Sequence, residues 1–221
     1  MKTKIAVIVF PGSNCDHDAY YVLNKVFGVD VGFVWHKETN LDDYDAVLIP
    51  GGFSYGDYLR TGAIARFSPI MESVIQSSKN GKPIIGICNG FQILLECGLL
   101  PGALINNSEI KFLSKSVTLE VVSKKSIFSN KLDIGEKMKM PIAHRQGNYI
   151  ADKGVLNDLT DQDRIIFKYK KNPNGSMLDI AGICNEKGNV LGMMPHPERA
   201  CENILGSIDG RRIFESMLGS M

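Results

Sequence analysis

The fold of this chain is decided by Pro-Ile-Ile-Gly-Ile-Cys-Asn-Gly-Phe-Gln, residues 83–92. The first half of this stretch is apolar and β-branched, which predicts a buried strand, whereas residues 89–99 carry apolar side chains at helical spacing. Cys88 lies where strand becomes helix, with Gly86 and Gly90 two residues away on either side. This pattern is typical of a nucleophile elbow, a strained turn that lifts a reactive side chain out of a sheet. The free N–H groups at the start of the helix favour the thiolate form of such a cysteine.

A buried cysteine that acts as a small hydrophobic side chain is the alternative for Cys88. The segment Gly-Ile-Cys-Asn-Glu, residues 182–186, offers a comparison within the same chain. Glu186 stands there in place of the second glycine, and the Lys-Gly-Asn that follows predicts a turn rather than a helix. We therefore interpret Cys184 as an ordinary strand cysteine and Cys88 as a candidate nucleophile.

The size and charge of the chain exclude several classes of function. The 221 residues suffice for one large α/β domain, and 25 lysines and arginines against 24 acidic residues give no reason to expect nucleic acid or an anionic membrane as a partner. Five widely spaced cysteines without a C-x-x-C pair predict neither a disulfide framework nor a zinc cluster. The apolar run at residues 5–10 is too short for a signal peptide or a membrane span. We expect a soluble, cytoplasmic protein.

Apolar runs of strand length recur along the chain, and helix-like segments separate the early ones. The predicted strands are residues 5–10, 31–35, 46–49, 84–87, 116–122, 164–169, 178–184 and 190–194, and the predicted helices are residues 15–27, 62–78, 89–99 and 210–218. This order predicts an α/β fold with a central, mostly parallel sheet and helices on both faces, and residues 105–169 predict an antiparallel or mixed part. With no linker or repeat, we expect a single domain over residues 1–221.

Two further segments follow predicted strands, as Cys88 does, and reactive groups in such sheets gather at the carboxyl ends of strands. One is Pro-Gly-Gly-Phe-Ser-Tyr-Gly-Asp, residues 50–57, and the other is Pro-His-Pro-Glu-Arg, residues 195–199. A cysteine nucleophile needs a base, and the base needs a group that orients it. Alternate residues of an extended segment face one side, so His196 and Glu198 are the predicted base and orienting carboxylate. A merely polar turn at a strand end is the alternative.

The diglycine at residues 51 and 52 predicts backbone donors for a developing oxyanion. We expect N–H groups from about Gly52 and Phe53, and a second donor from Asn89 on the elbow. An ordinary turn after a strand is the alternative. A phosphate-binding loop is disfavoured, because neither G-x-x-x-x-G-K-[ST] nor G-x-G-x-x-G occurs in the chain.

Gly-Ile-Cys-Asn-Gly-Phe-Gln with a downstream Pro-His-Pro-Glu resembles the class I, or triad, glutamine amidotransferases. The run Phe-Ser-Tyr-Gly-Asp-Tyr, together with residues 5–16, 141–149 and 194–199, is similar to one branch of that family, the glutaminase subunits of phosphoribosylformylglycinamidine synthases. The resemblance extends from residue 5 to residue 221 and implies a flavodoxin-like amidotransferase fold. The chain departs from the pattern at residues 144–147, His-Arg-Gln-Gly, where an acidic residue is expected before the glycine.

The resemblance implies hydrolysis of L-glutamine through a cysteine thioester. Cys88 would attack the carboxamide, His196 would protonate the departing nitrogen and then activate water, and Glu198 would orient His196. Gln92, one helical turn beyond Cys88, would contact the amino-acid end of the substrate, although the residues alone equally allow a helix-surface glutamine.

The resemblance also implies partners. Ammonia released near neutral pH becomes non-nucleophilic ammonium, so it should pass directly to an acceptor site. The expected acceptor is a large ATP-dependent synthetase subunit that binds formylglycinamide ribonucleotide in purine biosynthesis, often with a third, small subunit. Both ATP and magnesium would belong to the synthetase, and we expect no cofactor and no metal in this chain. We expect the partner to raise the glutaminase rate by ordering the oxyanion loop.

The other histidines have no predicted catalytic role. His17 is expected at a helix start and His36 at a strand end. His144 could line the site, but a loop position at a partner surface is the preferred interpretation. A metal site built from residues 15–18 is disfavoured, because adjacent side chains on one helical turn diverge.

Three other functions stay open from the sequence. One is a glutaminase that feeds a different acceptor. Another is a deglycase or a related cysteine hydrolase of the same sheet type, although these tend to have histidine directly after the nucleophile, where this chain has Asn89. The third is a regulatory module that has lost the chemistry, which the presence of Cys88, His196 and Glu198 disfavours.

Overall fold

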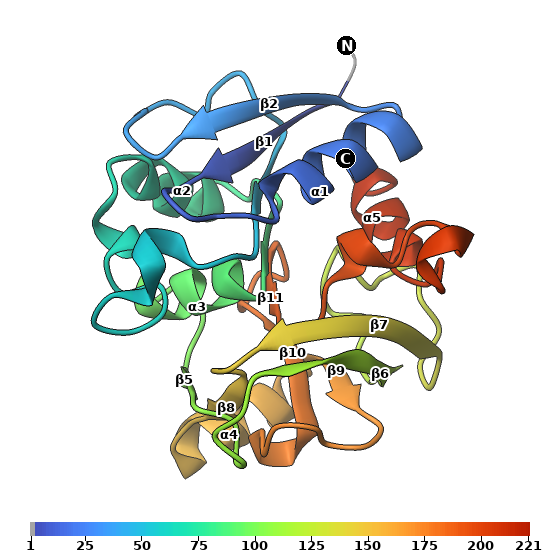
Figure 1. Ribbon diagram of the computed structural model, residues 1–221. Coiled ribbons are helices and arrows are strands. Elements are labelled where there is room, and N and C mark those ends of the chain that lie inside the picture. The colour runs from blue at the N-terminus through green and yellow to red at the C-terminus, as the bar shows by residue number, and fades with distance from the viewer. Residues whose placement is uncertain (1–2) are drawn as a thin grey trace.

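The computed structural model describes residues 3–221, and the two remaining residues of the predicted domain 1–221 lie outside this range. Within residues 3–221, nine strands form one sheet in the order β2-β1-β3-β4-β11-β10-β9-β6-β7 (Figure 1). Their bounds are β1 (Lys4–Val9), β2 (Asp30–Trp35), β3 (Ala46–Ile49), β4 (Ile84–Ile87), β6 (Leu113–Val121), β7 (Lys137–His144), β9 (Ile165–Tyr169), β10 (Ile180–Cys184) and β11 (Val190–Met193). A separate two-stranded sheet pairs β5 (Ala103–Ile105) with β8 (Asn148–Ile150).

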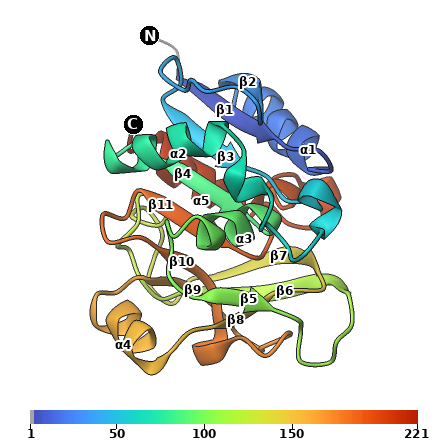
Figure 2. The ribbon, with the colours of Figure 1, turned by 90° about the vertical axis from the view of Figure 1, so that its left-hand side faces the viewer.

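Helices cover both faces of the large sheet. One face carries α2 (Ile70–Lys79) and α3 (Asn89–Glu96), and the opposite face carries α1 (Asp16–Tyr21) and α5 (Arg211–Leu218) (Figures 1 and 2). A fifth helix, α4 (Lys153–Asp161), lies at the end of the molecule that is far from β1 and β2 (Figure 2). The predicted α/β class, with helices on both faces of a mixed sheet, is confirmed.

The parallel half of the sheet consists of β2, β1, β3, β4 and β11. Every residue of β3, β4 and β11 is buried, which explains why their sequences are continuous apolar runs rather than alternating ones. The carboxyl ends of β1, β3, β4 and β11 therefore meet at one edge, as the sequence predicts.

The last strand of the antiparallel half, β7, runs in the same direction as the parallel strands. From β11 the pairings to β10, β9, β6 and β7 are all antiparallel, so β7 runs the same way as β11. Strand β7 is the edge strand and lies four positions from β11 in the sheet order. Nevertheless, the N–H of His196, just after β11, donates to the carbonyl of Pro141 in β7 at 2.9 Å. The sheet therefore curls, and β7 brings its carboxyl end, His144, to the edge where the parallel strands end.

Several segments differ from the sequence prediction, among them β5, β8 and the three that follow. The predicted helix 62–78 begins only at Ile70, because Ser68, which precedes Pro69, is extended (ψ 138°) and Gly62 is left-handed (φ +78°). Helix α4 was not predicted; it is capped by Asp152, whose side chain accepts from the Val155 N–H, and it buries fully only Leu159. Strand β7 alternates exposed and buried residues, whereas the prediction followed continuous apolar runs.

Among residues 3–221, no helix is both long and apolar enough to cross a membrane.

Candidate active site

Cys88 lies on a strained turn between β4 and α3. Strand β4 ends at Ile87, α3 begins at Asn89, and Cys88 between them has φ 51° and ψ −105°. A non-glycine residue pays about 1–3 kcal/mol for such a backbone, so strain of this kind marks functional sites. The predicted strand-to-helix elbow is confirmed as a structural feature.

The two glycines of the elbow are required by close backbone packing. A Cβ on Gly90 would lie 2.0 Å from the Ile49 carbonyl oxygen at the end of β3. A Cβ on Gly86 would lie 2.6 Å from the carbonyl oxygen of Gly90. The start of α3 is therefore pressed against two strand ends, which leaves no room for a side chain at either position.

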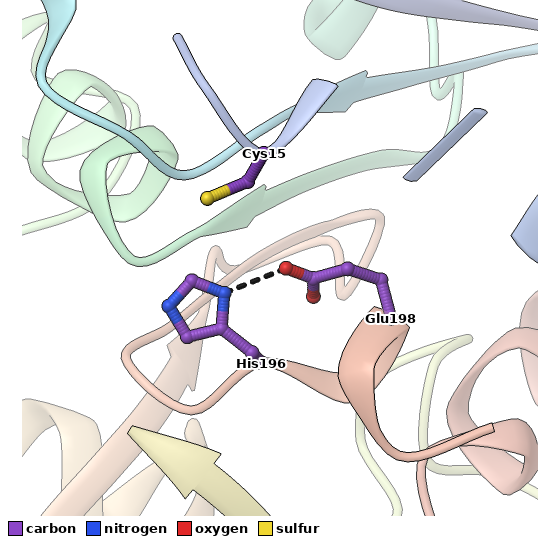
Figure 3. Close-up of side chains that lie close together, drawn as sticks. All are labelled: Cys15, His196 and Glu198. Atoms are coloured by element: carbon purple, nitrogen blue, oxygen red, sulfur yellow. Dashed lines mark hydrogen bonds and ion pairs between the residues drawn. The ribbon is translucent and has the colours of Figure 1, made fainter. Parts of the chain in front are cut away.

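His196 and Glu198 form a buried pair beyond the end of β11. Nδ1 of His196 lies 2.6 Å from Oε1 of Glu198, and both side chains are 1% exposed (Figure 3). Burial alone would lower the pKa of His196, but the charges on Glu198 and Cys88 outweigh it and raise this pKa well above its usual value. The predicted juxtaposition of these two side chains is present, and it favours the protonated, imidazolium form of His196.

The second ring nitrogen of His196 is the one that faces Cys88 in the proposed chemistry. Among residues 3–221, Nε2 of His196 has no hydrogen-bond partner, and the Cys88 sulfur lies 3.7 Å from the Ala143 carbonyl oxygen. A Cβ on Gly51 would lie 2.8 Å from Cε1 of His196 and 3.4 Å from Cβ of Cys88. Both side chains therefore approach the same glycine, whose missing side chain leaves them room to meet.

Cys88 opens onto a cavity of about 370 Å³ at the carboxyl edge of the sheet. The walls come from the turn after β3, from the start of α3 and from the end of β7 with its following loop. The lining residues are Gly52, Phe53, Asp57, Thr61, Cys88, Gln92, Asn106, Ala143, His144, Arg145 and Gln146. The sulfur is thus at the base of a site large enough for an amino acid and is not sealed inside the core.

A chain of hydrogen bonds ties these walls together. The Ser54 N–H donates to Oδ1 of Asn89 at 3.0 Å, and Nδ2 of Asn89 donates to Oε1 of Gln92 at 2.8 Å. Nε2 of Gln92 donates to the Gln146 carbonyl at 2.7 Å, and the Thr61 hydroxyl donates to Oε1 of Gln146 at 2.6 Å. Gln92 is therefore a buried wall residue rather than a helix-surface glutamine. Gln146 uses its side-chain oxygen to hold the turn after β3.

The predicted oxyanion donors are only partly available. Phe53 does not fit the prediction in this structure, because its N–H already donates to the Gly12 carbonyl at 2.8 Å. Within residues 3–221, the N–H groups of Gly52 and Asn89 have no acceptor, and the second of these is left free at a helix start.

Cys15 is a site neighbour that the sequence interpretation missed. Its sulfur accepts from Nη2 of Arg199 at 3.1 Å and lies over the His196–Glu198 pair (Figure 3). The same sulfur would lie 3.2 Å from a Cβ on Gly51. Cys15 follows the carboxyl end of β1, so the rule that selected the other three strand ends would also have found it.

Cys15, His196 and Glu198 place three metal-ligating atoms within 4.8 Å of one another. The Arg199 guanidinium beside the sulfur opposes a further cation. Burial, followed by the charge of Glu198, raises the pKa of Cys15 to about 12, so the thiol keeps its proton. These three side chains are therefore better explained as a histidine base, its orienting carboxylate and a neutral thiol packed beside them than as a metal centre.

The prediction that His144 lies in a loop at a partner surface is wrong. His144 ends β7, is 3% exposed and lines the cavity. Its Nδ1 lies 3.1 Å from Oδ1 of Asn107, whereas Nε2 has no partner among residues 3–221. Burial, together with the charge on His196, lowers the pKa of His144 to about 4.

His144 should make the stability of the protein sensitive to acid. In the unfolded chain a histidine has a pKa near 6.5. Between pH 6.5 and 4, His144 is therefore protonated in the unfolded state and remains neutral in the folded state. The stabilisation is complete above pH 6.5 and is lost as the pH falls towards 4. Between pH 7.5 and 5, wild type should lose about 2 kcal/mol more free energy of unfolding than His144→Gln. Urea titrations of both proteins at the two pH values measure this difference, and equal losses would contradict the assignment.

Residues 2–216 match the family model described as a CobB/CobQ-like glutamine amidotransferase domain. The chain belongs to the glutamine amidotransferase family and is an enzyme that hydrolyses glutamine. A chain in a structure of PurLQS from Thermotoga maritima is 46% identical, with 100% of this chain and 99% of that chain covered and a TM-score of 0.92.

Two more distant structures share the fold. A putative GMP synthase protein from Thermoplasma acidophilum is 19% identical, with a TM-score of 0.68 and coverage of 99% of this chain and 94% of that one. The glutaminase domain of CTPS from Trypanosoma brucei, with bound acivicin, is 14% identical, with a TM-score of 0.62 and coverage of 98% and 94%. At these identities the likeness concerns the fold alone.

Proposed function

We propose that this chain is the glutaminase subunit of a phosphoribosylformylglycinamidine synthase. It would hydrolyse L-glutamine and supply ammonia to a synthetase subunit that converts formylglycinamide ribonucleotide to formylglycinamidine ribonucleotide in de novo purine biosynthesis. The observation that carries the glutaminase part is the approach of Cys88 and the buried His196–Glu198 pair to one glycine beside a cavity. The full-length likeness to a chain of PurLQS supports the choice of acceptor.

The proposed mechanism uses Cys88 as nucleophile and His196 as the proton carrier. The Cys88 thiolate attacks the side-chain carbonyl carbon of glutamine, and the proton on Nε2 of His196 passes to the departing nitrogen. The resulting thioester is hydrolysed by a water molecule that gives its proton to Nε2 of His196 as it attacks, and the Cys88 thiolate leaves. Glu198 accepts from Nδ1 of His196 throughout, which fixes the ring and stabilises its positive charge. Gln92 would contact the amino-acid end of the substrate.

The oxyanion of this reaction would be stabilised by the Gly52 and Asn89 N–H groups, with Phe53 joining after a rearrangement. The Phe53 N–H is now bound to the Gly12 carbonyl, so the turn would have to shift before this donor could turn towards the cavity. We infer that docking of the synthetase drives that shift, which would keep hydrolysis slow in the isolated glutaminase.

We also propose the partner subunits, the domain organisation and the cellular compartment of the enzyme. ATP and magnesium would bind to the synthetase, a small third subunit would join the complex, and this chain would form one amidotransferase domain over residues 1–221. The family match over residues 2–216 supports the single domain. Five free cysteines support a reducing, cytoplasmic compartment.

The test compares two nitrogen sources in the presence of the synthetase. Formylglycinamidine ribonucleotide should form from ammonium chloride with the synthetase alone, whereas its formation from glutamine should require this chain. Glutamate release by this chain should also rise when the synthetase, ATP, magnesium and formylglycinamide ribonucleotide are present. Glutamine-dependent synthesis without this chain would overturn the assignment of the acceptor, and equal glutaminase rates with and without the synthetase would overturn the proposed activation.

A further inference from the structure

The cavity beside Cys88 carries one fixed charge of each sign. Of its lining residues, Asp57 is the only carboxylate and Arg145 is the only lysine or arginine. His144, the lining histidine, is neutral near pH 7, since its pKa is lowered to about 4. The walls are otherwise built from backbone, amide, hydroxyl and apolar groups. A ligand with one positive and one negative group matches this arrangement.

The half-buried Asp57 has one fully shielded carboxylate oxygen. Its Oδ1 atom is shielded from solvent and has no hydrogen-bond partner among residues 3–221. Burial raises the pKa of Asp57 to about 6, as expected for a carboxylate with no cation beside it. Leaving such an atom unsatisfied is costly, so a group that completes it on binding gains specificity.

The turn that carries Asp57 is held in position by other residues. Tyr55, Gly56 and Asp57 all have left-handed backbone angles, with φ of 53°, 64° and 55°. The Tyr55 hydroxyl lies 2.8 Å from Nδ1 of His36 and 2.9 Å from the Ser68 hydroxyl. The carboxylate is therefore presented at the cavity by a turn anchored elsewhere, and it has no structural bond of its own through Oδ1.

Arg145 supplies the opposite charge from the other wall. It directly follows His144 at the end of β7, and its guanidinium makes no ion pair or hydrogen bond within residues 3–221. Its backbone is fixed, because its carbonyl accepts from the Asn107 N–H at 2.9 Å. Asp57 and Arg145 thus line the same cavity from separate loops, Asp57 half-buried and Arg145 exposed, and neither side chain forms an ion pair within residues 3–221.

We propose that Asp57 binds the α-ammonium group of glutamine and that Arg145 binds its α-carboxylate, so that this pair determines selectivity for an α-amino acid amide. The proposal rests on the proposed glutaminase function. A zwitterionic end group held at the mouth would direct the side-chain carboxamide towards Cys88. It also gives a reason for a charge-balanced cavity in which neither charge is paired by another side chain within residues 3–221.

The first test needs only the wild-type chain in complex with its synthetase. Three amides are compared: glutamine, glutarate monoamide, which lacks the α-ammonium, and 4-aminobutanamide, which lacks the α-carboxylate. We expect kcat/KM for each analogue to be lower than for glutamine by roughly 10- to 150-fold, because each loses one charge-assisted contact in the cavity. Comparable values for glutamine and glutarate monoamide would overturn the role of Asp57.

Two variants then assign each group to its residue. Asp57→Asn should raise KM for glutamine by roughly 10- to 150-fold, and it should bring the ratio of kcat/KM for glutamine over glutarate monoamide close to one. Arg145→Met should do the same for the ratio of glutamine over 4-aminobutanamide and leave the first ratio high. Asp43→Asn, at an exposed position outside the cavity, is the matched control and should change neither ratio.

The outcomes separate this inference from the proposed function. If wild type hydrolyses glutamine but Asp57→Asn keeps full discrimination against glutarate monoamide, the inference is wrong and the glutaminase function stands. If wild type hydrolyses none of the three amides with the synthetase present, the proposed function itself fails. Should Asp57→Asn not fold, the wild-type comparison of the three amides and the Arg145→Met variant still decide the matter.

Discussion

Replacing Cys88 with alanine is expected to lower the glutaminase rate by roughly 10⁴-fold or more. The variant removes the only atom that can form the thioester, while the cavity and the His196–Glu198 pair stay in place. Alanine keeps the Cβ that the strained backbone at residue 88 (φ 51°, ψ −105°) already accommodates. Glutamate formation by the complex with the synthetase measures the loss, and ammonium-dependent synthesis should persist.

Cys184→Ala is the matched control for this variant. Cys184 lies in β10, is fully buried and has similar sequence neighbours, but it is far from the strand ends that form the site. Its replacement should cost some stability through the lost packing and should leave the turnover number within a few-fold of wild type. Turnover that survives Cys88→Ala, or that vanishes in Cys184→Ala without unfolding, would contradict the assignment of the nucleophile.

Glu198→Gln should lower kcat by roughly 10³- to 10⁴-fold with a much smaller change in KM. The carboxylate accepts from Nδ1 of His196 at 2.6 Å, and its charge holds the pKa of His196 above the usual value. A neutral amide can present its N–H₂ group to the ring instead, which favours the wrong tautomer, and it no longer stabilises the imidazolium. Steady-state kinetics with saturating synthetase measure both parameters.

The control for Glu198→Gln is Glu186→Gln, at an exposed position in the turn between β10 and β11. It changes the same charge by the same chemistry outside the site, and its kinetics should equal those of wild type. A Glu198→Gln enzyme that keeps kcat within tenfold of wild type would show that the carboxylate has no orienting role.

The parallel half of the fold could be predicted from sequence because burial on both faces leaves a continuous signal. Strands 46–49 and 84–87 were predicted with the bounds that the structure has, since every residue in them is apolar or glycine and buried. Helix α4 gave no such signal, because it buries one residue fully and contains Gly154 near its start. Strand β7 carried a two-residue alternation that a search for continuous apolar runs does not detect.

The candidate site could be predicted as far as it depends on strand ends. Cys88, His196 and Glu198 follow recognisable strands, so their meeting at one edge required only the rule for carboxyl ends. The position of His144 depends on four antiparallel pairings and on the curl of the sheet, which no local pattern encodes. The engagement of the Phe53 N–H by Gly12 likewise depends on how two loops pack, which their glycines permit but do not specify.

The central claim is that Cys88, and not its neighbour Cys15, attacks the substrate. The most direct measurement is peptide mass analysis after incubation of the synthetase complex with 6-diazo-5-oxo-L-norleucine, an electrophilic analogue of glutamine. We predict one adduct, on the peptide that contains Cys88, with glutamine protecting against it. An adduct on Cys15, or a Cys88 peptide that stays unmodified while the enzyme is inactivated, would contradict the account.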